Sequence, residues 1–129
     1  MIKNLSHIGI AVKDLERAVE TYKSLFGLDA STTIEPPGLK VSMIKVGECH
    51  VELLQPTTAE GPIAKFIEKR GEGIQHICFE VENIERAIEA LSAKGMEFAT
   101  RNPQQGAEGL IVFLHPKMTH GVLIELVQK

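Results

Sequence analysis

The stretch HIGIAVKDLERAVE, residues 7–20, recurs in the chain as HICFEVENIERAIE, residues 76–89. The two copies lie at a fixed offset of 69 residues, and seven of their fourteen positions are identical. An alternating strand followed by a capped helix does not by itself require an identical histidine and an identical Glu-Arg-Ala run at the same spacing. We therefore interpret the chain as an internal duplication.

Each copy has the pattern of a strand followed by a helix. Apolar residues alternate over residues 5–12 and 74–81, which indicates strands, and Asp14 and Asn83 stand where helix N-caps are expected. The other expected elements are a connecting helix over 60–70 and strands near 29–34, 40–46, 49–55, 96–100, 110–115 and 121–128. The predicted fold class is α+β: a single domain, residues 1–129, in which a βαβββ module (1–57), a linker helix (58–73) and a second βαβββ module (74–129) form a curled mixed sheet.

The composition narrows the classes of function. With 43% apolar and 24% charged residues, the chain has the make-up of a soluble globular protein. The net charge is −3 and the Lys and Arg residues are dispersed, so the sequence shows no basic patch that would bind nucleic acid. No apolar run is long enough to span a membrane. No signal peptide is visible and the 2 cysteines form no disulfide framework, so we expect a cytoplasmic protein. The sequence has no G-x-S-x-G, P-loop or G-x-G-x-x-G motif, so it gives no support for a serine hydrolase, a nucleotide hydrolase or a dinucleotide-binding protein.

Two histidines and two glutamates occupy equivalent places in the two halves. His7 and His76 stand in the first strand of each half, and Glu52 and Glu125 stand between apolar residues in the last strand. A duplicated unit places equivalent residues around a local two-fold axis, so we expect the four to converge on one sheet face. Two imidazoles with two carboxylates favour Zn, Co, Ni, Fe or Mn over Ca or Mg, and leave positions open for substrate.

Each of these residues also has a simpler interpretation. A single strand histidine is more often a hydrogen-bonded structural residue than a ligand, and a glutamate between apolar residues usually marks the exposed face of an edge strand. The matched set of four favours the metal. Among the remaining candidates, His50 is a possible spare ligand on the face of Glu52, Cys78 is a thiol beside His76, and His115 and His120 fit a solvated turn.

The chain resembles the vicinal-oxygen-chelate (glyoxalase-like) superfamily over its whole length, and the methylmalonyl-CoA epimerases within it. The matching segments are LSHIGIAVKDLERAVETYKSLFGL, VELLQP, GEGIQHICFEVENIERAIEAL and FLHPKMTHGVLIEL. The resemblance implies a U-shaped sheet around a metal and a cytoplasmic homodimer. It implies His7, His76 and Glu125 as metal ligands, and places Glu52 where relatives carry Glu or Gln.

The activity implied is metal-dependent epimerisation of methylmalonyl-CoA, a small-molecule thioester, through a metal-stabilised enolate. The cofactor implied is Co, Zn, Ni or Mn. We assign Glu125 as the carrier of the α-proton and Glu52 as the group that serves the second face, and Lys117 is a weaker candidate for an acidic part of the substrate. Residues 39–46, LKVSMIKV, contain no acid, which disfavours a scheme that draws a second acid/base carboxylate from that strand.

Other activities fit the same frame. Lactoylglutathione lyase (glyoxalase I) resembles the epimerase in its ligand set and enolate chemistry, although the HPK and GVLIEL segments favour the epimerase. Extradiol dioxygenases use two His and one Glu with iron, usually in a longer chain. A drug-sequestering binding protein would dispense with the ligands and line its cavity with aromatic residues, whereas this chain has no Trp, 1 Tyr and 5 Phe.

Overall fold

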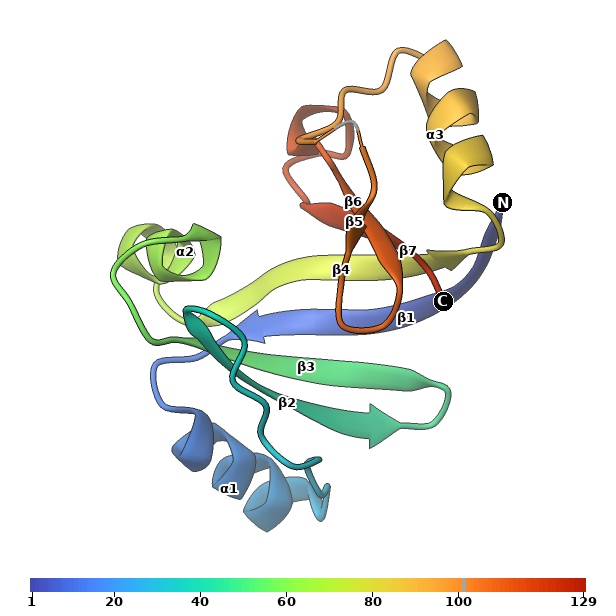
Figure 1. Ribbon diagram of the computed structural model, residues 1–129. Helices are drawn as coiled ribbons and strands as arrows, with labels where there is room; N and C mark the ends of the chain where they lie inside the picture. The colour runs from blue at the N-terminus through green and yellow to red at the C-terminus, as the bar shows by residue number, and fades with distance from the viewer. Residues whose placement is uncertain (101) are drawn as a thin grey trace. The chain divides into compact units, whose positions relative to one another are not determined.

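A computed structural model describes residues 1–100 and 102–129, which form two compact units (Figure 1). The N-terminal unit comprises His7–Gln75, and the C-terminal unit comprises Met1–Ser6 together with His76–Lys129. The division falls inside strands β1 (Ile2–Ala11) and β4 (Gly73–Val81), so each of these strands contributes residues to both units.

The N-terminal unit contains a mixed sheet in the order β2-β3-β1. Strand β3 (Cys49–Pro56) runs parallel to β1 and antiparallel to β2 (Leu39–Val46). The unit also contains helix α1 (Leu15–Phe26) and the connecting helix α2 (Pro62–Arg70). The parallel β1–β3 pairing requires the long crossover that α1 and β2 provide.

The two helices of this unit pack on opposite faces of β3. Leu15 of α1 is buried with Leu53, whereas Ile63 of α2 is buried with Leu54. Successive strand residues point to opposite faces, so Glu52 shares the face of Leu54 and points away from α1. This alternation places the carboxylate on the face that α1 leaves uncovered.

Helix α1 begins and ends where the sequence predicts. The Asp14 side chain accepts a hydrogen bond from the backbone N–H of Arg17 at 3.1 Å, which caps the first turn. Gly27 closes the helix at φ +68°, a left-handed conformation that glycine adopts without steric cost.

The C-terminal unit repeats the arrangement with strands in the order β4-β7-β6-β5. Strand β7 (Ile124–Gln128) is parallel to β4 and antiparallel to β6 (Leu110–Leu114), and β5 (Gln104–Gln105) pairs with β6. Helix α3 (Ile84–Ala93) is capped by the Asn83 side chain, which accepts from the Arg86 N–H at 3.0 Å.

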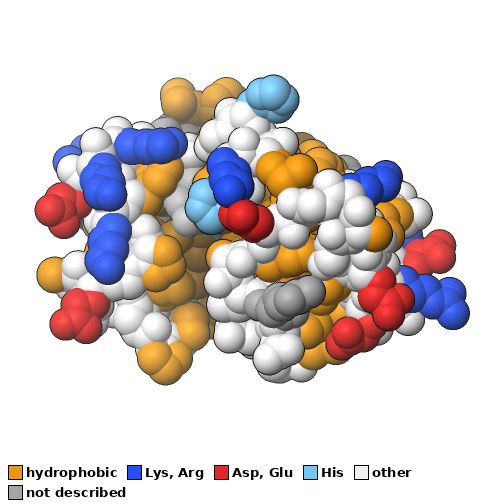
Figure 2. Space-filling model, turned by 90° about the horizontal axis from the view of Figure 1, so that it is seen from above, with side chains coloured by type: hydrophobic (Ala, Val, Ile, Leu, Met, Phe, Trp, Pro, Cys, Tyr) orange, Lys and Arg blue, Asp and Glu red, His pale blue; other side chains and the backbone are white. Residues whose placement is uncertain are grey.

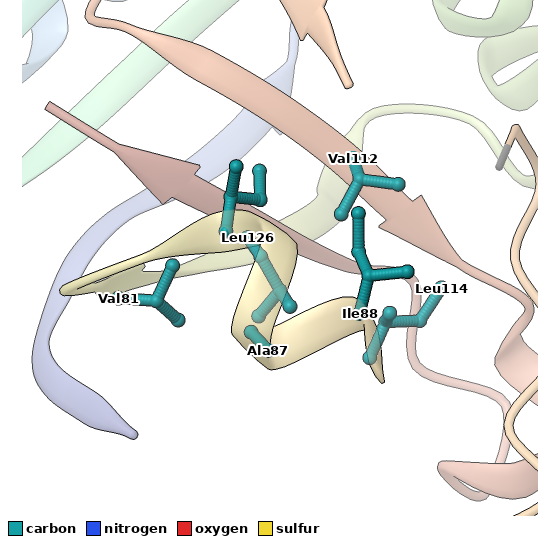
Figure 3. Close-up of a cluster of buried hydrophobic side chains, with 7 residues drawn as sticks. Val81, Ala87, Ile88, Val112, Leu114 and Leu126 are labelled. Carbon is teal, nitrogen blue, oxygen red and sulfur yellow. The ribbon is translucent and has the colours of Figure 1, made fainter. Parts of the chain in front are cut away.

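Figure 3 shows how α3 packs on this sheet. Ala87 and Ile88 of the helix meet Leu126 of β7, which is 1% exposed, in one cluster of buried side chains. Because neighbouring residues of β7 alternate in direction, Glu125 points to the face opposite α3. The other buried members of the cluster are Val81, Ile84, Val112 and Leu114.

The strand expected at 29–34 is wrong as an independent element, since this segment forms only two isolated bridges, Ala30–Ile44 and Ile34–Val41. The Ser31 hydroxyl accepts the Met43 N–H at 3.0 Å, a bond that a backbone carbonyl would accept in a continuous ladder. A side chain that replaces the backbone acceptor in this way interrupts the strand.

The strands expected at 96–100 and 121–128 are also corrected. The former is reduced to the bridge Phe98–Leu114, and β5 forms further along the chain. The last strand begins at Ile124, after the 3₁₀ helix η1 (Pro116–Met118) and its turn. The α+β class and the βαβββ order of the repeats are confirmed. In the first repeat, the first of the three strands after α1 is present only as bridges.

No helix within the described part of the chain is long and apolar enough to cross a membrane. Acidic and basic side chains are interspersed with hydrophobic ones on the face shown in Figure 2. This face therefore carries both signs of charge.

Candidate functional site

In the N-terminal unit, His7 and Glu52 lie on neighbouring parallel strands. Register pairs Gly9 of β1 with Glu52 of β3, so the carboxylate stands diagonally next to His7. The imidazole Nε2 is 3.6 Å from the carboxylate Oε1. The His7 side chain is 6% exposed and that of Glu52 is 13% exposed. The pair is thus largely shielded from solvent.

The C-terminal unit holds the equivalent pair, His76 and Glu125. Here Cys78 of β4 is paired in register with Glu125 of β7, as Gly9 is with Glu52. The His76 Nε2 lies 3.8 Å from the Glu125 Oε1, and both residues are buried. The Phe113 ring contacts the imidazole edge-on, with the ring centroids 6.0 Å apart. The same diagonal contact thus occurs in both units.

Parallel pairing explains why each unit brings its histidine and glutamate together. The two residues come from the first and last strands of one repeat, and these strands are direct neighbours in both units. A strand His and a strand Glu two positions apart in register then share one face. Each unit by itself therefore brings one imidazole and one carboxylate together.

The donor set of each pair fits a divalent transition metal. Two ligands bound about 2.1 Å from one ion at tetrahedral angles lie about 3.4 Å apart, close to the 3.6 and 3.8 Å observed. A buried carboxylate also requires a cation or hydrogen-bond donors as partners. The atoms are thus spaced and buried as in a site that holds a cation.

Side chains of the turn HPKMTHG, residues 115–121, bond within the turn and to Glu97. His115 Nδ1 accepts the Lys117 N–H at 3.2 Å, and His120 is exposed with φ +57°. Lys117 Nζ lies 2.7 Å from Glu97 Oε2. The hydrogen bond and charge of Lys117 hold the pKa of the Glu97 carboxyl below its ordinary value. Both exposed histidines match the solvated turn that the sequence predicts.

Cys78 and His50 lie beside the two pairs. Cys78 is fully buried next to Glu125, and His50 is directly opposite His7 in the β1–β3 register. Among the residues that the structure describes, His50 Nδ1 is buried without a hydrogen-bond partner. Sequence patterning placed His50 on the face of Glu52, but only the strand register shows that it adjoins His7.

The N-terminal unit also has a surface cavity of about 480 Å³ at the start of α1. Its lining includes Val12, Arg17, Tyr22 and Glu72. Val12 lies an odd number of positions from His7 along the same stretch, which places it on the opposite face of the sheet. The cavity is therefore separate from the imidazole–carboxylate pair.

Comparison with known proteins agrees with this fold. Residues 6–113 match the family model of the Glyoxalase/Bleomycin resistance protein/Dioxygenase superfamily. The chain is 40% identical to the mitochondrial methylmalonyl-CoA epimerase of Homo sapiens over 96% of this chain and 73% of that protein. It is also 40% identical to an ethylmalonyl-CoA/methylmalonyl-CoA epimerase of Cereibacter sphaeroides, over 99% of both.

A solved structure gives the same result. The chain is 33% identical to a Streptomyces coelicolor methylmalonyl-CoA epimerase in complex with 2-nitronate-propionyl-CoA, with a TM-score of 0.93 over 100% of this chain and 96% of that one. Fold, repeat and sequence identity agree over nearly the full length. The chain belongs to the Glyoxalase/Bleomycin resistance protein/Dioxygenase superfamily, in which it is similar to methylmalonyl-CoA epimerases.

Proposed function

We propose that this protein is a metal-dependent methylmalonyl-CoA epimerase. The observation that carries the proposal is the largely buried imidazole–carboxylate pair repeated in both units of a chain that is 40% identical to named epimerases. The substrate class comes from those relatives, and the donor chemistry comes from this chain.

The proposed metal ligands are His7, Glu52, His76 and Glu125, which together hold one divalent ion such as Co, Zn, Ni or Mn. When bound, the ion supplies Lewis-acid stabilisation of the negative charge that develops on the thioester oxygen. The two neutral imidazoles contribute no charge of their own, so the carboxylate side of the site supplies its negative charge.

In the proposed reaction, a Glu125 oxygen takes the proton from the carbon between the thioester and the carboxylate. The C–H bonding pair moves into the enolate, and Glu52, which carries a proton at the start of this direction, returns that proton to the opposite face of the carbon. The reaction thus ends with Glu125 protonated and Glu52 ionised. Positioned acid–base groups of this kind contribute about 10²–10⁴-fold in rate. The reverse direction exchanges the two roles, so the pair serves both epimers.

Exchange of the α-proton with solvent tests this activity. Metal-loaded protein in D₂O is offered methylmalonyl-CoA and, separately, the adduct of methylglyoxal and glutathione, and deuterium incorporation is followed by NMR. The proposal expects exchange at the α-carbon of methylmalonyl-CoA alone. Turnover of the glutathione adduct alone would instead identify a lactoylglutathione lyase.

We also propose that the protein functions as a homodimer in the cytoplasm. The dimer rests on the family resemblance, and the compartment rests also on the lack of a disulfide framework in the sequence. Sedimentation equilibrium of the purified chain distinguishes a dimer from a monomer, and fractionation of the source cells tests the compartment.

A further inference from the structure

A row of three nitrogen-bearing side chains crosses the sheet of the N-terminal unit. His50 of β3 is paired with His7 of β1 on one side and with Lys45 of β2 on the other. Residues paired across strands project to the same face. His7, His50 and Lys45 therefore form one row on the face that carries Glu52.

Two members of this row have unused capacity to bind an anion. The buried Nδ1 of His50 has no hydrogen-bond partner in residues 1–100 and 102–129, although buried polar atoms are nearly always paired. Lys45 is exposed and forms no ion pair with any described residue. Glu52, the acid on this face, lies against His7 rather than Lys45.

The face changes character along the strands. The next row contains Gly9, Glu52 and Met43, and the row after it contains Ala11, Leu54 and Val41, buried against α2. Positive charge is thus concentrated at the Lys45 end, and apolar surface at the α2 end. A ligand that spans these rows would combine an anionic group with a small apolar substituent.

We propose that His50 and Lys45 bind the free carboxylate of the acyl group, Lys45 through its charge and His50 through an imidazole N–H. This inference rests on the proposed function, because methylmalonyl thioesters carry such a carboxylate beside the reacting carbon. It makes the two residues specificity determinants that select thioesters of dicarboxylic acids over those of monocarboxylic acids. The phosphates of CoA present the same anionic oxygens, so the test separates the two sources.

The test is calorimetric binding of two ligands to the metal-loaded protein. Isobutyryl-CoA has the branched skeleton of methylmalonyl-CoA, with a methyl group in place of the free carboxylate and the same CoA phosphates. We expect Lys45→Gln and His50→Leu each to weaken methylmalonyl-CoA binding by about tenfold or more, as for a hydrogen bond to a charged group. Isobutyryl-CoA should bind all variants within about twofold of wild type.

Two variants serve as controls. Lys40→Gln removes a lysine from the opposite face of β2 and should leave both affinities unchanged. His50→Asn restores an amide donor near the position of Nδ1 and should recover part of the loss. Circular dichroism checks that each variant is folded.

The possible outcomes separate this proposal from the proposed function. Equal weakening of both ligands would assign the row to the CoA phosphates and overturn the inference. Unchanged binding of methylmalonyl-CoA in both variants would also overturn it, while leaving the epimerase proposal intact. If wild-type protein binds neither ligand, both proposals fail together.

Discussion

The side chain of Gln55 accepts a hydrogen bond from the backbone N–H of Leu15 at 2.8 Å, which joins the end of β3 to the first turn of α1. Gln128 accepts from the Ile84 N–H at 2.8 Å and joins β7 to α3 in the same way. Each glutamine follows the candidate ligand glutamate of its strand by three positions. The duplication therefore extends to the contact that attaches the glutamate strand to the helix.

This contact predicts a loss of stability when the acceptor is removed. Gln55→Ala leaves the part-buried Leu15 N–H without its partner and should lower the free energy of unfolding by about 1–3 kcal/mol. Gln55→Glu keeps an acceptor oxygen near the helix N-terminus and should lose little. Urea unfolding measures both, with the exposed Gln104→Ala as the control, and an equal loss in all three variants would contradict the prediction.

The ligand assignment predicts loss of metal. His7→Ala and His76→Ala each remove an imidazole, so bound metal should fall from about one ion per chain to a small fraction. Elemental analysis of the purified proteins measures the content. His120→Ala, at an exposed turn, should keep the metal; full occupancy in the His7 and His76 variants would disprove the assignment.

The proton-transfer role predicts loss of exchange without loss of fold. Glu125→Gln keeps the size of the side chain but removes its basic oxygen, so α-proton exchange should fall by about 10²–10⁴-fold or more. Deuterium incorporation measured by NMR reports the rate. Glu89→Gln, on the exposed side of α3, is the matched control. Wild-type exchange in the Glu125 variant would rule out this residue as the proton carrier.

The lowered pKa of the Glu80 carboxyl predicts how the free energy of unfolding changes at acid pH. The Asn4 amide donates to Glu80 at 3.3 Å, and this bond, with the charges of Lys129 and Lys3, lowers the pKa of the carboxyl below its ordinary 4.5. When folding lowers the pKa of a carboxyl, its ionised form stabilises the folded protein at pH values above the unfolded-state pKa. This stabilisation is lost as the pH falls through the folded-state pKa. Wild type should therefore exceed Glu80→Gln in stability at about pH 7.

The pH series itself is the measurement. Thermal or urea unfolding of wild type and Glu80→Gln should show a difference that is largest above 4.5 and shrinks as the pH is lowered further. Glu89→Gln makes the same change of charge at an exposed position and should show a smaller pH-dependent difference. A difference between wild type and Glu80→Gln that does not change with pH would contradict the prediction.

Local sequence signals predicted the helices well, as they did the strands near 40–46 and 110–115, but they failed for 29–34 and 96–100. Asp14 and Gly27 mark the ends of α1 because capping depends on residues within a few positions of the helix terminus. The segment 29–34 has no such local constraint. Whether it joins a ladder depends on Met43, which bonds to the hydroxyl of Ser31 as well as to its backbone.

The sequence by itself determined the duplication, the α+β class and the two equivalent sets of histidine and glutamate, because these depend on spacing along the chain. Only the tertiary structure decided which side chains are neighbours within each unit. His7 meets Glu52, and His50 lies between His7 and Lys45, through the register of β3 with β1 and β2. Register is a long-range property: a shift of one residue would turn the whole strand over and place His50 and Glu52 against α1, where Val51 and Leu53 pack.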